Sequence, residues 1–322
     1  MSNNISNSCT IAPESTSTDA GIAGTGILLS FIISAFLALF LSAFIVFSEI
    51  RAQTSRNITR RILSGLSDSQ IFQGIGIQAV GLAKVETIVP YHFFIIWMLA
   101  LLSTATNFAA LLALVQDFKR DWVLRWLRQF AMFVNVVLTI VYGVFVLRTN
   151  LADLAPTLPM ACVWQNHEKN EDAQGNKTLS IVGTAAAIAI SAVVFVLGTW
   201  YLHMRKQTWG KSVRAFSLLV LLGVAIGAAV RVILVSQAFG TPSVKLDDAG
   251  ETEWSFGQLL VMLLLILPFV SALEIFRGQM QVPHANAFAD SDQVPLTSQY
   301  GREQKSDHDA EYTYQPNPSF RS

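Results

Sequence analysis

Long apolar runs alternate with short polar segments along the chain. The runs that could each form one helix are 22–48, 66–83, 91–115, 129–147, 179–202, 215–238 and 256–276. About 20 helical residues cross the roughly 30 Å hydrocarbon core of a bilayer. Backbone groups inside that core must bond to one another, so each run should be helical. The pattern therefore predicts an all-α, polytopic membrane helix bundle with seven transmembrane helices, or six if one run does not cross.

The run 66–83 is the doubtful one, because it contains Asp68, Gln70, Gln73 and Gln78. With the N-terminus outside and seven crossings, twelve Lys and Arg residues fall in cytoplasmic loops and five in outer loops. With six crossings the counts become nine and eight. Cytoplasmic loops of membrane proteins are enriched in Lys and Arg. The charge pattern therefore favours seven helices, with the C-terminus in the cytoplasm.

The two ends of the chain differ in composition from the runs. We expect a disordered outer tail over 1–20, the helix bundle over 21–276 and a disordered cytoplasmic tail over 277–322, which is rich in Ser, Gln, Asp, Tyr and Pro. Such polar segments bury too little apolar surface to fold alone. The first apolar run is longer than a signal-peptide core, so it should be retained as the first helix.

Charge composition supports a membrane location. Charged residues make up 14% of the chain, against about a quarter in soluble proteins. Only Asp68, Arg231 and Glu274 lie within the seven runs. The net charge is zero and no basic stripe is present, which argues against nucleic acid as a partner. The expected partners are membrane lipids and an unidentified ligand or protein, at the plasma membrane or an endomembrane of the secretory pathway.

Two sequence features, the cysteines and the glycosylation sequons, agree with the segments assigned to the outer side of the membrane. The only cysteines, Cys9 and Cys162, both fall outside, where an oxidising compartment permits a disulfide; two unpaired thiols are the alternative. Asn4 and Asn176 begin glycosylation sequons on outer segments, which makes the chain a candidate glycoprotein. A third sequon, at Asn57, lies on the inner side and should be unused.

Catalytic motifs are missing from the sequence. It has no P-loop, no HExxH and no CxxC, and its five histidines lie in five different segments. We therefore expect no catalytic residue, no cofactor and no metal site, and we do not expect an enzyme.

Polar residues within apolar helices are costly, which makes them functional candidates. Arg231 shares one face of the sixth helix with Gly223 and Gly227, a GxxxG pattern that lets a neighbouring helix approach closely. Arg231 either extends to the outer headgroups or takes a ligand-binding or gating role, with Glu251, Glu253 or Glu86 as its partner. Pro268 should kink the seventh helix, either as a hinge or as a static bend.

Two polar stripes mark the third and fourth helices. They consist of Ser103, Thr104 and Asn107 on one helix and Asn135, Thr139 and Tyr142 on the other. Their spacing places each set on one helix face. Facing one another, they would form interhelical hydrogen bonds that hold the bundle together. A polar cavity for a small ligand, rimmed by Tyr91 and His92, is the alternative.

The segment LSDSQIFQGIGI at 66–77, followed by Tyr91-His92 and LSTAT at 102–106, resembles a group of uncharacterised multi-spanning membrane proteins of filamentous fungi. The resemblance covers about residues 62–130. It implies a fungal plasma-membrane or endomembrane protein and no particular reaction. It would make Asp68, Gln70 and His92 a shared structural or functional site. Asp68 can equally be a helix N-cap, which we prefer.

Together these patterns predict a non-enzymatic sensor, receptor-like protein or scaffold. Its mechanism would be a shift of the sixth and seventh helices around the GxxxG face and Pro268, transmitted to the basic inner loops and the tail. A small-solute transporter or channel is the alternative. That class usually has ionisable residues near the membrane midplane and an internal repeat, neither of which is evident.

Overall fold

The computed structural model describes residue 9 and residues 12–51, 57–120, 122–164, 177–203 and 210–281. The chain divides into two compact units, Met1–Phe276 and Arg277–Ser322. Of the second unit, the described part is 277–281, the last residues of a helix. The description below therefore concerns the first unit. The predicted tail 277–322 lies almost wholly outside the described residues.

The described residues of the first unit form helices, with one isolated β-bridge and no strand. The long helices are α3 (Thr25–Ile50), α4 (Asn57–Ala83), α5 (Pro90–Ala113), α7 (Trp122–Ala152), α8 (Lys177–His203) and α9 (Gly210–Val235). The last helix is divided into α10 (Phe256–Leu264) and α11 (Leu267–Gln281). Short helices are α2 (Ala20–Ala23), α6 (Val115–Arg120) and a 3-10 helix at Met160–Trp164.

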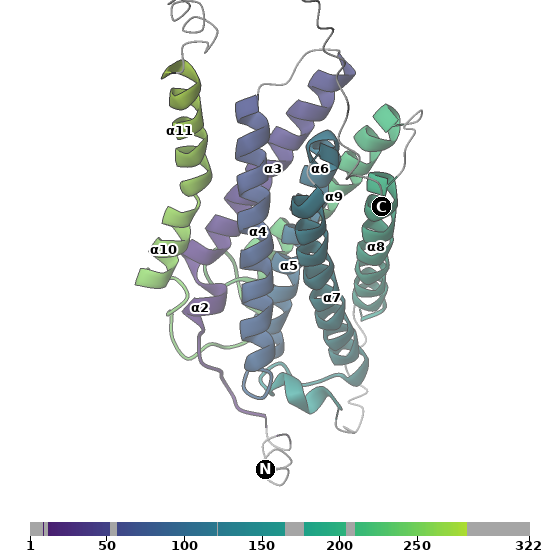
Figure 1. The fold of residues 1–322 in the computed structure, drawn as a ribbon. Helices are drawn as coiled ribbons and strands as arrows, with labels where there is room; N and C mark the ends of the chain where they lie inside the picture. Colours follow the sequence, from purple (N-terminus) through teal and green to yellow (C-terminus); the bar gives the residue numbers. More distant parts are fainter. Residues whose placement is uncertain are drawn as a thin grey trace, which may run out of the picture. The chain divides into compact units, whose positions relative to one another are not determined.

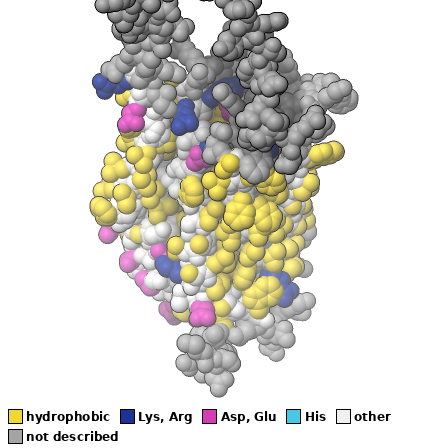
Figure 2. Space-filling view, viewed as in Figure 1, with side chains coloured by type: hydrophobic (Ala, Val, Ile, Leu, Met, Phe, Trp, Pro, Cys, Tyr) yellow, Lys and Arg dark blue, Asp and Glu magenta, His cyan; other side chains and the backbone are white. Residues whose placement is uncertain are grey.

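Six helical stretches among the described residues are long and apolar enough to cross a membrane, which indicates a membrane protein. They are Ala20–Ile50, Pro90–Ala113, Arg125–Ala152, Ser180–Trp200, Val213–Val235 and Phe256–Glu274. Helix α4 is not among them, since its glutamines and other polar residues lower its hydropathy. Charged side chains on the face in Figure 2 gather toward its two ends, with hydrophobic side chains between.

Helix α5 is the centre of the bundle. It packs against α3, α4, α7, α8 and α9, and α4 and α7 run beside it in Figure 1. Nearly all of its residues are buried. Apart from its polar stripe, α5 is apolar around its circumference, and in this bundle neighbouring helices cover it.

Successive long helices run in alternating directions. Contacts between helix ends show this, since they fall into two groups, one at each end of the bundle. At one end, Asp19 before α2 pairs with Lys84 after α4. This end, which also holds Cys9 and Cys162, is called the disulfide end. At the other end, Glu49 of α3 pairs with Arg60 of α4 and Arg214 of α9. We call this second group, together with Arg128 of α7, the arginine end.

The segment before α2 makes backbone contacts with the α9–α10 loop where the structure describes it, and the disordered tail predicted for 1–20 stays a prediction. The backbone N–H of Thr16 donates to the carbonyl of Lys245, and the N–H of Asp247 donates to the carbonyl of Thr16. A disulfide joins Cys9 to Cys162, 153 residues away. These partners are distant in sequence and leave no local pattern, so sequence periodicity does not reveal the contacts. Residues 1–8, 10 and 11 lie outside the described residues.

The break between α10 and α11 falls at Leu265 and Ile266, just before Pro268. Proline has no N–H to donate, and its ring clashes with the carbonyl four residues earlier, that of Leu264. The bend predicted for this helix is therefore present. The two alternatives for this bend, a hinge or a static bend, both stay predictions.

Candidate functional site

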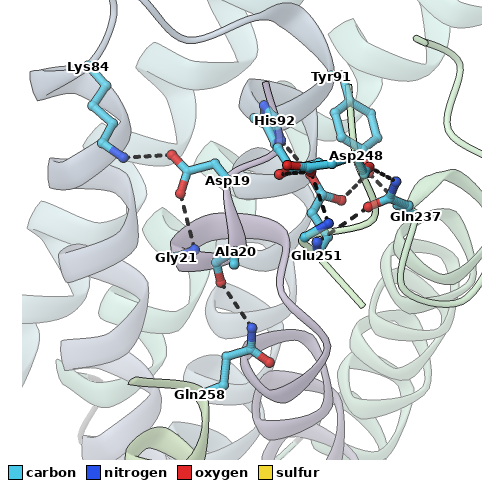
Figure 3. Close-up of polar contacts among 12 residues, drawn as sticks. Asp19, Ala20, Gly21, Lys84, Tyr91, His92, Gln237, Asp248, Glu251 and Gln258 are labelled. Carbon is cyan, nitrogen blue, oxygen red and sulfur yellow. Dashed lines mark hydrogen bonds and ion pairs between the residues drawn. The ribbon is translucent and has the colours of Figure 1, made fainter. Parts of the chain in front are cut away.

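The side chain of Glu251 is completely buried at the disulfide end. Its Oε2 accepts a hydrogen bond from the Tyr91 hydroxyl at 2.7 Å, and its Oε1 lies 2.6 Å from Nε2 of His92 (Figure 3). Burying a carboxylate without partners is strongly unfavourable. Here each carboxyl oxygen has a hydrogen-bond partner, so the side chain is held in one position.

Local sequence explains how these side chains meet. Pro90 occupies the first turn of α5, where its missing N–H is not needed, and Val89 before it is extended. Tyr91 and His92 therefore project from the first turn of α5, where the helix dipole favours a nearby negative charge. Glu251 comes from the loop between α9 and α10, and its carbonyl accepts hydrogen bonds from the N–H and hydroxyl of Thr25 at the start of α3.

Gln237, just beyond the end of α9, completes the cluster. Its N–H donates to the Tyr91 hydroxyl at 2.9 Å, and its side-chain Nε2 donates to the carbonyl of Asp248 at 2.7 Å. The starts of α3 and α5, the end of α9 and the α9–α10 loop thus share one set of hydrogen bonds around Glu251. We call Tyr91, His92, Gln237 and Glu251 the Glu251 cluster.

A polar cavity of about 210 Å³ adjoins this cluster. It is lined by hydroxyl side chains at 16–18, by Thr87, by the Lys84–Asp19 pair and by His92. His92 therefore borders the cavity and also bonds to Glu251. A molecule that enters this cavity would contact His92, which belongs to the central helix α5.

The α9–α10 loop is tied to the segment before α2 by a second acid. The hydroxyl of Thr18 donates to Oδ1 of Asp248 at 2.5 Å, and the N–H of Gly250 donates to the same oxygen at 3.0 Å. Both donors favour the ionised form, so they hold the pKa of the exposed Asp248 carboxyl below its usual value. This contact fixes the loop that carries Glu251.

Deeper in the bundle, the two predicted polar stripes come together around α4. Gln78 donates to Oδ1 of Asn135, Asn135 donates to Thr104, and the Tyr142 hydroxyl donates to the carbonyl of Gln78. Ser103 donates to the carbonyl of Gln70, and Ser67 donates to Asn107. We call this set the polar seam. From the sequence alone, Gln78 is only a polar interruption of an apolar run, whereas the fungal resemblance names Gln70 as a candidate site residue.

Two glycines of α4 allow this close approach. A Cβ atom at Gly74 would lie 2.6 Å from the Ser103 hydroxyl oxygen, and one at Gly81 would lie 2.2 Å from that of Tyr142. Any larger residue would push these side chains away. Gly74 and Gly81 therefore let α4 contact α5 and α7 through polar groups.

The prediction for the sixth helix needs correction. No described atom lies within 4 Å of a Cβ atom placed at Gly223 or Gly227, so their shared face packs against no described helix. Arg231 is exposed and makes no ion pair with a described residue; Glu251, one expected partner, bonds to Tyr91 and His92 instead. Helix α9 packs through its opposite side, with Leu221, Ala225, Ala228 and Val232 buried.

Of three further predicted residues, the structure places one, Asp68. Asp68 is not an N-cap, because α4 begins at Asn57; Asp68 instead bonds to Arg128. Asn4 and Asn176 lie outside the described residues. Within the described segments, no group of three metal-ligating side chains occurs.

Comparison with known proteins gives no relative. No family model, no curated protein and no solved structure matches the chain. The fungal resemblance of residues 62–130 therefore stays a prediction.

Proposed function

We propose that the chain is an integral membrane protein that crosses the membrane seven times and acts as a receptor-like sensor without a catalytic centre. The disulfide end faces outside and the arginine end faces the cytoplasm. The fungal family suggested by residues 62–130 is part of this proposal, as is a location in the plasma membrane or secretory pathway. A disulfide fits the oxidising side of such membranes.

The geometry of α4 supports the seventh crossing. The helix has 27 residues, about 40 Å at 1.5 Å per residue, and packs against α3, α5 and α7. Its Gln70 and Gln78 are fully buried, while Phe72 and Val80 are 71% and 46% exposed. Polar groups thus point into the bundle and apolar ones away from it, which is the arrangement that lipid requires.

The Glu251 cluster is the observation that carries the sensor proposal. It attaches an outer loop and a polar cavity to the first turn of α5, the helix that packs against α3, α4, α7, α8 and α9. At the other end α5 leads into α6, where Asp117 pairs with Arg60 at 2.9 Å and Arg60 pairs with Glu49. A displacement of α5 at the cavity would therefore act directly on the arginine end.

The alternatives have less support. A small-solute transporter or channel needs polar groups that are free to bind the passing solute. In the polar seam, the side chains of Ser103, Asn135 and Tyr142 bond to neighbouring helices. This bonding favours a packing role for the seam. A scaffold would have no need of a cavity joined to a buried carboxylate.

Hydrogen exchange separates a sensor from a scaffold without knowledge of the ligand. Glu251→Gln weakens the cluster, and Glu253→Gln is the matched control, since Glu253 is exposed and lies in the same loop. We expect Glu251→Gln to raise amide exchange at the start of α5 and also in α6 and the first turns of α4. Glu253→Gln should change neither region. If exchange rises only at the disulfide end, the receptor-like proposal fails and a scaffold remains.

A further inference from the structure

A second cavity lies at the arginine end, between α4, the start of α7 and the break that separates α10 from α11. Its volume is about 670 Å³. The polar side chains of its lining are Arg61, Ser64, Asp68, Ser69, Gln73, Arg128 and Ser271. We call this cavity the arginine cleft. Neither the Glu251 cluster nor the polar seam includes it.

Arg128 is the principal polar group of the cleft and is only 6% exposed. One of its terminal nitrogens donates to the hydroxyl of Ser64 at 2.7 Å and also contacts Asp68. Its Nε is buried and finds no hydrogen-bond partner among the described residues. The guanidinium also lies over the ring of Phe118, 4.8 Å from its centroid, so Arg128 is held in place at the cleft.

The charges of the cleft favour an anion. Arg61, Ser64 and Asp68 follow one another at helical spacing on one face of α4. Two guanidinium groups, on Arg61 and Arg128, face one carboxylate, on Asp68, so the lining carries a net positive charge. Guanidinium groups bind phosphate oxygens with paired, charge-assisted hydrogen bonds.

The other part of the lining is apolar and open to the side. Phe72, Leu264 and Leu267 line it, and all three are exposed on the outer surface of the bundle. Pro268 lies against α4, since a Cβ atom at Gly65 would be 3.0 Å from the Cβ of Pro268. The break before Pro268 thus contacts α4 at Gly65 and leaves a cleft beside that contact, with an arginine pair at one end and apolar side chains at the other.

We infer that the arginine cleft binds an acidic phospholipid from the leaflet at the arginine end. The phosphate bonds to the guanidinium groups of Arg61 and Arg128, and an acyl chain lies along Phe72 and Leu267. Asp68 holds Arg128 in place. The inference rests on the proposed membrane insertion, because the lipid enters from the bilayer through the open side of the cleft.

The test uses the purified full-length chain in a mild detergent and measures its melting temperature as lipid is added. Phosphatidic acid and phosphatidylcholine with the same acyl chains are compared, with inorganic phosphate as a soluble anion. We expect phosphatidic acid to raise the melting temperature and the other two to leave it unchanged. If phosphatidylcholine raised the melting temperature equally, the cleft would not select an acidic headgroup. If inorganic phosphate raised it equally, the ligand would be a soluble anion and not a lipid.

Variants then place the lipid in the cleft. Arg61→Gln should weaken apparent phosphatidic acid affinity about tenfold, the usual effect of losing one charge-assisted contact. Arg51→Gln is the matched control, because Arg51 is exposed at the end of α3 and does not line the cleft. Leu267→Trp, which fills the apolar part, should also weaken binding. Unchanged affinity in both Arg61→Gln and Leu267→Trp would place the lipid elsewhere.

Membrane insertion is measured in a separate experiment, so that its failure can be distinguished from a failure of lipid binding. If the chain is not retained in membranes after alkaline carbonate washing, the proposed function fails together with this inference. If it is retained but shows no preference for the acidic lipid, the inference alone fails.

Discussion

Oε1 of Glu251 lies 2.6 Å from Nε2 of His92, and the exposed fractions of both side chains are near zero. The contact joins residues 159 positions apart, one in the α9–α10 loop and one in the first turn of the central helix. Removing one partner of a buried hydrogen bond leaves the other polar group unsatisfied, which is strongly unfavourable. This contact therefore sets the position of the α9–α10 loop on α5.

Substitution of Gly81 tests the close approach of α4 and α7. In Gly81→Ala, the new Cβ would lie 2.2 Å from the Tyr142 hydroxyl oxygen and 2.5 Å from Cδ1 of Ile96. Overpacking of this kind lowers the free energy of unfolding by about 1–3 kcal/mol. Gly76→Ala is the control, because no described atom lies within 4 Å of its Cβ. Thermal unfolding should show a loss only for Gly81→Ala, and equal behaviour of the two would refute the packing described for α4.

The disulfide between Cys9 and Cys162 is expected to stabilise the folded chain. Cys9→Ser should lower the free energy of unfolding by about 2–4 kcal/mol, since the bond closes a long loop of the unfolded chain. The double variant Cys9→Ser/Cys162→Ser should lose little more than the single one. A reducing agent should lower the melting temperature of the wild type and leave that of the double variant unchanged. A wild type insensitive to reduction would contradict the bond.

Asp248 gives the contact between the α9–α10 loop and the segment before α2 a dependence on pH. Its pKa is lowered in the folded chain by the hydroxyl of Thr18 and the N–H of Gly250. The ionised carboxyl therefore stabilises the fold above its unfolded pKa, and that stabilisation is lost as the pH falls through the folded pKa. The charged groups nearest in the loop are Asp247, Lys245 and Glu253.

Asp248→Asn keeps an oxygen acceptor and removes the charge. The stability difference between wild type and Asp248→Asn should be present at about pH 6 and should shrink below about pH 4, near the usual pKa of Asp. Thermal unfolding across this range measures it. A difference that stays constant with pH would mean that the charge of Asp248 has no role in the loop.

Sequence periodicity predicted some parts of this fold well. The charge-free run 91–115 corresponds to α5, and Pro268 marked the break of the last helix. Ser103, Asn135 and Tyr142 were recognised as stripes because helical spacing is a local property. Local patterns of this kind are what a single sequence reveals.

Other parts depend on contacts between distant residues. Glu251 is one of several acids in its loop, and nothing in the sequence separates it from Glu253; only the approach of Tyr91 and His92 does so. The face of α9 was assigned wrongly because the GxxxG pattern shows where close packing is allowed, not which side is buried. Ala225 and Ala228 on the other side provide small residues equally well.

The number of crossings is tested by the location of the two ends of the chain. Seven crossings place the N-terminus and a tag after Ser322 on opposite sides of the membrane. Protease protection of sealed vesicles should therefore digest one end and spare the other. Two ends on the same side would mean that α4 does not cross and would return the count to six.

The central claim is that the Glu251 cluster and the arginine end are energetically coupled through α5. Coupling between sites is a free energy, and a double-mutant cycle measures it directly. The cycle combines Glu251→Gln with Asp117→Asn, which removes the pair between α6 and Arg60. The effects of substitutions at distant, independent sites on the free energy of unfolding add to within about 0.3–0.5 kcal/mol. We predict a coupling in the free energy of unfolding above that limit, and additive losses would contradict the account.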